Sequence, residues 1–468
     1  MAEKKNEAKL LSEKLLSKRE NAAQKMTDKE IKAADDFCEG YKSFLNAART
    51  EREATEYFVA LAKKRGFEEF AEGKKYAAGS RVYKVNRGKS VILAVIGEKD
   101  VKHGVRIAAA HIDSPRLDLK PNPLYEDSDA ALFKTHYYGG IKKYQWTAIP
   151  LALHGVIIKK DGTSVKVNIG DEAGEPQFVV TDLLPHLAAE QMKRTLNDGV
   201  KGEELNILVG SRPFRSDEGS SLVKLNVMKL LNEKYGIIES DFLSAELEAV
   251  PAFKASDIGF DRSMIGSYGH DDRVCAYPAA MAALDVKKPE YTLLSVLTDK
   301  EETGSDGNTG LNSSYMKYFI NDLAKMQGAS GYEVLRNSTC LSADVNAAFD
   351  PTFPEVADRN NFAFINHGVV VTKYTGRAGK SGTSDASAEF VGKVRRIFDG
   401  SGVIWQTGEL GKVDIGGGGT VAKYIANLDV DVVDVGVPVL SMHAPFEVVS
   451  KIDVYMAYRA FLEYFKAV

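Results

Sequence analysis

Two adjacent glutamates, Glu301 and Glu302, lie in the stretch 298–305 that closes the apolar run 291–297. An apolar run that ends in acidic residues and then Gly304 is typical of a buried parallel strand whose carboxyl end carries a site. Two neighbouring carboxylates repel each other unless protons or cations compensate, and a divalent metal compensates best. If the segment is extended, one glutamate could bind a metal while its neighbour faces the substrate as a general base. On its own, the pair is equally compatible with a solvated strand end.

A second strand end carries His111 and Asp113, which follow the small-residue run 105–110. Side chains two residues apart on an extended segment lie on the same side, so His111 could bind a metal while Asp113 orients its ring. A lone histidine at a strand end is more often only hydrogen bonded. The pattern therefore indicates a candidate ligand that needs partners.

Three further residues have comparable positions. Asp271 lies in the loop that leads into the predicted helix 275–284, where it could bridge two metals or serve as an ordinary N-cap. Asp344 follows the run 341–343, and His443 follows the predicted strand 434–440. Because parallel strands gather their carboxyl ends at one sheet edge, we expect these side chains to converge with His111 and the glutamate pair. Two histidines and several carboxylates suit two divalent ions, with zinc preferred and manganese or cobalt as alternatives.

The elements that must position these residues alternate between strands and helices. Helices are predicted over 31–47, 51–65, 313–326, 385–397 with Ser384 as N-cap, 420–426 and 449–465; strands are predicted over 81–85, 90–96 and 369–374. This alternation predicts an α/β fold. Four glycines, 416–419, would let the backbone approach a ligand closely.

Between residues 121 and 251 short strand-like pieces replace the alternation, which predicts an inserted, mostly antiparallel β domain. The catalytic domain would then comprise 37–120 and 252–468. Residues 1–36 carry leucines at helical spacing among Lys and Glu, and we expect an exposed helical arm there.

Composition excludes several function classes. The chain has 61 basic and 65 acidic residues among 468, a net charge of -4, so no global field recruits nucleic acid or anionic membranes. Three cysteines without a CxxC motif suit a reducing compartment. The charged N-terminus lacks the apolar core of a signal peptide, and no window has the ~18 apolar residues that span a bilayer. We therefore expect a cytoplasmic protein.

Rival catalytic motifs are poorly supported. The stretch Gly376-Arg377-Ala378-Gly379-Lys380-Ser381 resembles a phosphate-binding loop, but Tyr374 stands where the motif requires its first glycine. HExxH and GxSxG motifs are absent from the sequence. An NTPase or a serine hydrolase is therefore not supported.

The motifs together resemble those of the aspartyl aminopeptidase family of di-metal peptidases, from about Tyr41 to the end of the chain. They are His111-Ile-Asp-Ser-Pro, Asp271-Asp272-Arg273, Asp299-Lys-Glu-Glu-Thr-Gly-Ser, Ser342-Ala-Asp344 and Met442-His443. The resemblance implies a phosphorylase/hydrolase-like three-layer α/β/α catalytic domain with an inserted, mostly β domain that mediates assembly into a homo-dodecamer. It implies that Asp271 bridges two metal ions, that His111 and Asp344 complete one shell, and that Glu302 and His443 complete the other. Glu301 would be the general base, and Asp113 would brace His111.

The resemblance also implies peptide substrates with N-terminal aspartate or glutamate. Lys373 matches the family's cationic position approximately, and His186 matches a histidine that reaches a neighbouring subunit's site. The stretch 138–146 lacks the Asp-Arg pair associated with the family. Two alternatives therefore stay open: the same scaffold with neutral-residue or deblocking specificity, and a non-catalytic assembly protein on this fold.

Overall fold

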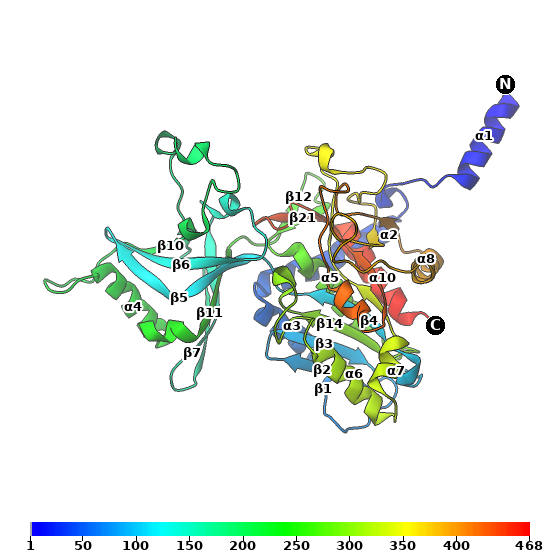
Figure 1. The fold of residues 1–468 in the computed structure, drawn as a ribbon, viewed down its shortest axis with the longest axis horizontal. Helices are drawn as coiled ribbons and strands as arrows, with labels where there is room; N and C mark the ends of the chain where they lie inside the picture. The colour runs from blue at the N-terminus through cyan, green and yellow to red at the C-terminus, as the bar shows by residue number, and fades with distance from the viewer. Residues whose placement is uncertain (1) are drawn as a thin grey trace.

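The computed structural model describes residues 2–468, with side chains from Glu7 onward. These residues form two lobes (Figure 1), and three β-sheets contain the strands. The larger lobe is a helix-covered sheet and the smaller lobe is mostly antiparallel β structure. The predicted α/β class with a β-rich insertion is confirmed.

The central sheet of the larger lobe has nine strands. In spatial order they are β1 (Glu68–Glu69), β2 (Arg81–Asn86), β3 (Ser90–Val95), β14 (Leu293–Thr298), β4 (Arg106–His111), β15 (Thr339–Ser342), β19 (Asp431–Gly436), β17 (Val369–Thr372) and β18 (Trp405–Thr407). The four strands β14, β4, β15 and β19 run parallel to one another. Their carboxyl ends therefore lie side by side at one sheet edge.

Helices cover both faces of this sheet. One face packs against α2 (Asp28–Ala47), α3 (Glu51–Lys64), α5 (His270–Asp285), α8 (Ala388–Ser401) and α10 (Lys451–Lys466); the other packs against α6 (Tyr315–Met326), α7 (Gly331–Arg336) and α9 (Ala422–Ala426). Each face has its own apolar cluster, with Phe58 and Phe461 in one and Ile92 and Phe319 in the other. The larger lobe thus has three layers, α/β/α.

The predicted N-cap of α8 is wrong by one turn. Ser387, rather than Ser384, accepts a hydrogen bond from the backbone N–H of Phe390 and begins the helix. The backbone N–H of Ala386 donates to the carbonyl oxygen of Lys373 at 2.9 Å. This loop contact keeps the preceding residues out of the helix.

The smaller lobe is a seven-stranded antiparallel sheet. Its order is β8 (Ser164–Ile169), β7 (Leu151–Ile158), β11 (Ala245–Pro251), β5 (Arg116–Asp127), β6 (Ala130–Tyr138), β10 (Ile207–Gly210) and β9 (Val179–Val180). The helix α4 (Leu222–Tyr235), which the sequence pattern did not indicate, packs on β5 and β6. Strand β5 starts five residues after His111, so the smaller lobe is attached directly beside the central sheet edge.

A third sheet contains β12 (Ser256–Ile258), β13 (Met264–Ser267), β21 (Glu447–Ser450), β20 (Pro438–Leu440) and β16 (Asn346–Ala347). Strands β13 and β21 pair antiparallel, with Ser267 opposite Glu447. This pairing brings the loop that follows β20 next to the loop that precedes α5.

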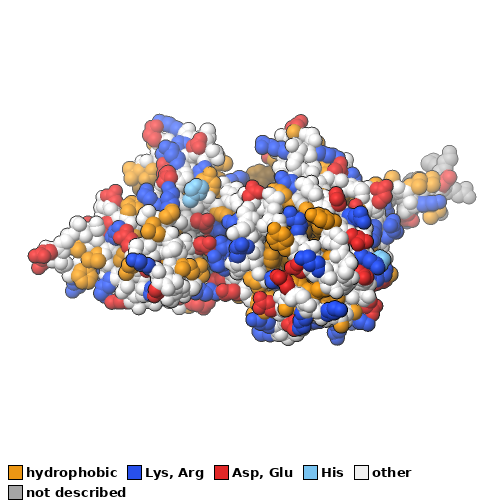
Figure 2. Space-filling model, turned by 60° about the horizontal axis from the view of Figure 1, so that its bottom comes forward, with side chains coloured by type: hydrophobic (Ala, Val, Ile, Leu, Met, Phe, Trp, Pro, Cys, Tyr) orange, Lys and Arg blue, Asp and Glu red, His pale blue; other side chains and the backbone are white. Residues whose placement is uncertain are grey.

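The N-terminal helix α1 (Ala2–Leu15) projects from the larger lobe (Figure 1) and exposes Leu10, Leu11 and Leu15. The segment behind it is docked: Arg19 donates to the carbonyl oxygens of Arg359 and Phe362. Basic and acidic side chains are interspersed over the face shown in Figure 2. Among residues 2–468, none of the helices combines the length and apolarity needed to cross a bilayer.

Candidate metal centre

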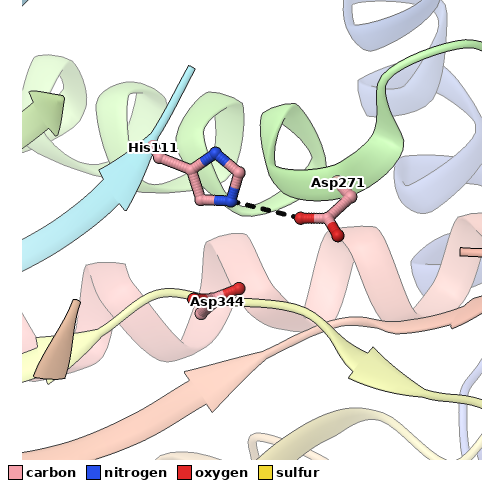
Figure 3. A group of neighbouring side chains, drawn as sticks. All are labelled: His111, Asp271 and Asp344. Atoms are coloured by element: carbon pink, nitrogen blue, oxygen red, sulfur yellow. Dashed lines mark ion pairs between the residues drawn. The ribbon is translucent and has the colours of Figure 1, made fainter. Parts of the chain in front are cut away.

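Residues remote in sequence meet at the carboxyl edge of the parallel strands. His111 is the last residue of β4 and lies in register with Thr298 of β14, while Asp344 lies two residues beyond β15. Asp271 approaches from the start of α5, and its carboxylate points toward the His111 ring (Figure 3). The three side chains come from three different elements and enclose one small volume.

Two groups of possible ligands share one member. The donor atoms of His111, Asp271 and Asp344 lie within 4.8 Å of one another, and so do those of Asp271, Glu302 and His443. One oxygen of Asp271, Oδ1, is 3.2 Å from His111 Nε2, and the other, Oδ2, is 3.1 Å from His443 Nε2. Asp271 therefore faces both groups at once.

The donor set fits divalent cations. His111 Nε2 and Glu302 Oε1 are buried without a hydrogen-bond partner, although Asp271 and His443 lie within ion-pair distance of them. Burial raises the pKa of Glu302 and of Asp344, and neighbouring carboxylates raise both further. Buried nitrogen and oxygen donors that lack partners are what a cation would satisfy.

The backbone at Asp271 is not helical, with φ −79° and ψ 110°. Its N–H donates to Glu447 Oε2 at 3.2 Å, and its carbonyl oxygen accepts from Ser114 Oγ at 2.7 Å. The carboxylate, directed at His111 and His443, is not engaged as an N-cap. The ordinary cap that the sequence left open is thus not what Asp271 forms, because its carboxylate faces His111 and His443 instead.

Asp113 connects His111 to the two glutamates. Its carboxylate accepts hydrogen bonds from the backbone N–H of Glu301 at 3.2 Å, that of Glu302 at 3.3 Å, and the hydroxyl of Tyr138 at 2.8 Å. The same carboxylate lies 3.2 Å from His111 Nδ1, and the Asp113 carbonyl oxygen lies 3.0 Å from that nitrogen. Asp113 therefore fixes the ring of one candidate ligand and the backbone of another.

The glutamates lie on a 3-10 turn, Glu301–Thr303, and the expectation of an extended segment there is wrong. The chain must turn so that two successive N–H groups reach the Asp113 carboxylate. The two side chains still separate: Glu302 Oε1 lies 3.5 Å from His443, while Glu301 Oε2 is 3.9 Å from His111. Burial raises the pKa of Glu301 to about 7.

His443 is held by two contacts that the sequence did not indicate. Its backbone N–H donates to Glu447 Oε1 at 2.8 Å, and its ring Nδ1 lies 2.7 Å from the carbonyl oxygen of Gly140. The only sequence signal for Glu447 is its position four residues after His443 at the start of a strand. Gly140 and Tyr138 belong to the edge of the smaller lobe, and their sequence context has no comparable signal.

A cavity of about 560 Å³ opens over the centre. Asp271, Glu301, Glu302, Asp344 and His443 line it together with residues of the glycine run and of the helix that follows, namely Gly417, Gly418, Gly419, Thr420, Lys423 and Tyr424. Among the described residues of this lining, Lys423 is the only lysine or arginine.

Two residues predicted to bind substrate lie elsewhere. Lys373 Nζ pairs with Asp385 at 2.9 Å, and neither residue lines the cavity. His186 is exposed on the short turn Pro185–Leu187 of the smaller lobe, also outside the lining. The structure of one subunit therefore brings neither residue to the centre.

Comparisons of the sequence and of the structure with known proteins point to the same family. A family model described as Aminopeptidase I zinc metalloprotease (M18) matches residues 44–465. A probable M18 family aminopeptidase 1 from Clostridium acetobutylicum is 48% identical over 459 residues, which are 96% of this chain and 99% of the relative. The crystal structure of an M18 family aminopeptidase from Thermotoga maritima has a TM-score of 0.92 and 45% identity, covering 97% of this chain and 100% of that chain. The S. cerevisiae mApe1 dodecamer is similar in fold, with a TM-score of 0.75 and 20% identity over 94% of this chain and 97% of that chain.

Proposed function

Because the chain belongs to the M18 family of zinc aminopeptidases, we propose that it uses two divalent cations at this centre to remove acidic residues from the N-termini of peptides. As a family member it is a metallopeptidase, and the non-catalytic alternative is therefore set aside. The observation that supports two ions is the position of Asp271, whose carboxylate belongs to both groups of candidate ligands.

In this proposal the first ion is held by His111, Asp344 and Asp271, and the second by Glu302, His443 and Asp271. Nitrogen and oxygen donors of this kind suit zinc, and also manganese or cobalt. Once bound, the two cations would supply Lewis acidity that polarises the scissile carbonyl and lowers the pKa of a nearby water.

Glu301 is the proposed general base. Its carboxylate lines the cavity without belonging to either group of candidate ligands. A carboxylate whose pKa burial raises to about 7 can accept a proton from the attacking water near neutral pH and return it to the leaving amine. Asp113 would keep Glu301 in place through the backbone hydrogen bond and would hold the His111 ring beside it.

Assembly is a further part of the proposal. Around His186 the smaller lobe exposes Leu183, Leu184, Leu187 and Met192, apolar side chains that a second copy of the chain could cover. We expect a homo-oligomer in which His186 contributes to a neighbouring subunit's site; light scattering coupled to gel filtration would measure its mass. Binding of substrate by Lys373 remains a prediction.

One experiment tests both the metal and the substrate parts. The protein is stripped with a chelator, bound metal is counted during titration with zinc, manganese or cobalt, and initial rates are measured on matched aspartyl, glutamyl, leucyl and N-acetylated peptides. We expect two equivalents of metal per chain and the highest kcat/KM on aspartyl or glutamyl peptides. Full activity with a single equivalent would overturn the two-ion proposal. A higher kcat/KM on leucyl peptides would favour the neutral-residue alternative, and a higher kcat/KM on N-acetylated peptides would favour the deblocking alternative.

A further inference from the structure

We propose that the ammonium group of Lys423 binds a carboxylate of the peptide substrate and thereby selects among substrates. This inference rests on the proposed peptidase function and names the residue that would recognise the negative charge of the substrate. The carboxylate could be the side chain of an N-terminal aspartate or glutamate, or the C-terminal carboxylate of a short peptide. The test below separates these two sources.

The first observation is that Lys423 is the free cation of the cavity. Within the described lining it is the only lysine or arginine, and it forms no ion pair with a described carboxylate. Lys373 and Lys380 lie outside this lining, and both pair with the single carboxylate of Asp385 at 2.9 Å. A ligand carboxylate entering the cavity would therefore meet one uncompensated positive side chain.

The second observation is that Lys423 is held relative to the catalytic turn. Its Nζ lies 4.8 Å from the centre of the Tyr424 ring, an attractive cation–π contact. The Tyr424 hydroxyl donates to the carbonyl oxygen of Gly304 at 2.7 Å, and Gly304 directly follows the turn Glu301–Thr303. The Lys423 ammonium therefore contacts the Tyr424 ring, and the Tyr424 hydroxyl is hydrogen bonded to the segment that carries Glu301 and Glu302.

Among the described lining residues between Thr375 and Tyr424, Lys423 has the only charged side chain. Residues 417–419 are glycines, and a Cβ at Gly417, whose φ is +116°, would lie 1.9 Å from the carbonyl oxygen of Gly376. The chain needs glycine for this close approach, so backbone forms much of this part of the lining. Recognition of a substrate charge on this side of the cavity falls to Lys423.

The charge of the cavity favours this role only when cations are bound. Asp271, Glu301, Glu302 and Asp344 line the same space and would repel a substrate carboxylate. Two divalent ions would offset these four negative charges, and the half-buried Lys423 would then leave a positive excess. A charge-assisted hydrogen bond to a carboxylate is stronger than one to a neutral amide.

Isosteric substrate pairs provide the test. The first pair, Asp-Ala-amide and Asn-Ala-amide, differs only in the side-chain carboxylate; the second, Leu-Ala and Leu-Ala-amide, differs only in the C-terminal carboxylate. For each pair the ratio of kcat/KM values is measured with the metal-loaded wild type and Lys423→Gln. We expect one ratio to exceed 1 in the wild type and to fall roughly 10- to 100-fold in Lys423→Gln, mainly through KM. Loss of the first ratio identifies the side-chain carboxylate, and loss of the second identifies the C-terminus.

Two lysine variants make the result specific. Lys317→Gln removes a partly exposed lysine of α6 that does not line the cavity, and both ratios should keep their wild-type values. Lys373→Gln tests Lys373, the residue that the sequence predicted to bind substrate. If a kcat/KM ratio falls in Lys373→Gln but not in Lys423→Gln, the inference is overturned. Wild-type ratios of 1 or less for both pairs, or unchanged ratios in Lys423→Gln, would overturn it as well. Failure to hydrolyse any of the four peptides after metal loading would instead refute the proposed function.

Discussion

His443 donates a hydrogen bond from ring Nδ1 to the carbonyl oxygen of Gly140 at 2.7 Å, although 303 residues separate them in the sequence. The acceptor is a backbone oxygen, so the proton must be on Nδ1, and Nε2 remains free to face Asp271 and Glu302. Gly140 follows β6 of the smaller lobe. The smaller lobe therefore orients one of the candidate metal ligands of the larger lobe.

Substituting Gly140 tests this relationship. A Cβ built at Gly140 would lie 3.4 Å from His443 Nδ1, an ordinary contact distance, so a single methyl group fits. The branched side chain in Gly140→Val would extend toward the ring and displace it. We expect Gly140→Val to weaken metal binding about 10- to 100-fold, as loss of a group that orients a ligand usually does. Competition with a chromogenic chelator would measure the affinity.

Gly140→Ala is the matched control, because it makes the same backbone change without the branch. Its metal affinity should stay much nearer to the wild-type value. Equal affinities for the valine variant and the wild type would show that Gly140 does not position the His443 ring. Melting temperatures of both variants would reveal any general loss of stability.

Glu301 and Glu302 should respond differently to the same substitution. Glutamine keeps the size of each side chain but removes its charge and its ability to accept a proton. Glu301→Gln should lower kcat by about 10²- to 10⁴-fold while metal content stays at the wild-type level. Glu302→Gln should lower metal content, because it removes an anionic donor that lies 3.5 Å from His443. Metal analysis after dialysis and steady-state rates would be measured on the same preparations.

The pair also serves as its own control, since the residues are adjacent and share the Asp113 contacts. If Glu301→Gln lost metal as readily as Glu302→Gln, Glu301 would be a ligand and its role as general base would be wrong. If Glu301→Gln kept full activity, another group would have to accept the proton.

The strand-end positions of His111 and Asp344 could be predicted because an apolar run shows where a buried strand stops. The pattern of alternating strands and helices then predicts that such ends share one edge. The role of Asp271 was not decided by the same reasoning. A carboxylate before a helix has the same local sequence whether it caps the helix or faces a metal, and only the approach of His111 and His443 separates the two cases.

The particular hydrogen bonds and ion pairs between segments remote in the chain could not be predicted from the sequence. Glu447 bridges the backbone N–H groups of Asp271 and His443 because β13 and β21 pair, a register that local propensity does not encode. The cation that lines the cavity is Lys423, whereas Lys373 lies outside the lining and pairs with Asp385. The sequence shows that a residue is a lysine and roughly where it lies in the fold, but it does not show which carboxylate that lysine pairs with.

A buried histidine between the lobes should make stability depend on pH. His154 of β7 lies 3.0 Å from Glu53 of α3 and 3.0 Å from Asp171, which follows β8. Burial disfavours the charged ring, but the two carboxylates outweigh burial and raise the pKa of His154. Burial also opposes ionisation of Glu53 and Asp171, yet contact with His154 lowers the pKa of both. The native state therefore favours one charged histidine between two charged carboxylates.

The sign of the pH effect follows from these directions. The histidine's contribution is fully present below its unfolded pKa of about 6.5 and is lost as pH rises through the raised native pKa, where stability should fall by at most about 1.4 kcal/mol per pH unit. The carboxylates' contribution is present above about pH 4.5 and is lost as pH falls through their lowered native pKa values. The urea denaturation midpoint, measured from pH 5 to 9, should decline with rising pH above 6.5 more steeply in the wild type than in His154→Gln, because buried carboxyls with raised pKa values, such as Glu301, contribute to the decline in both proteins. A variant that declined as steeply as the wild type would show that other groups cause the pH dependence and that His154 makes no contribution to it.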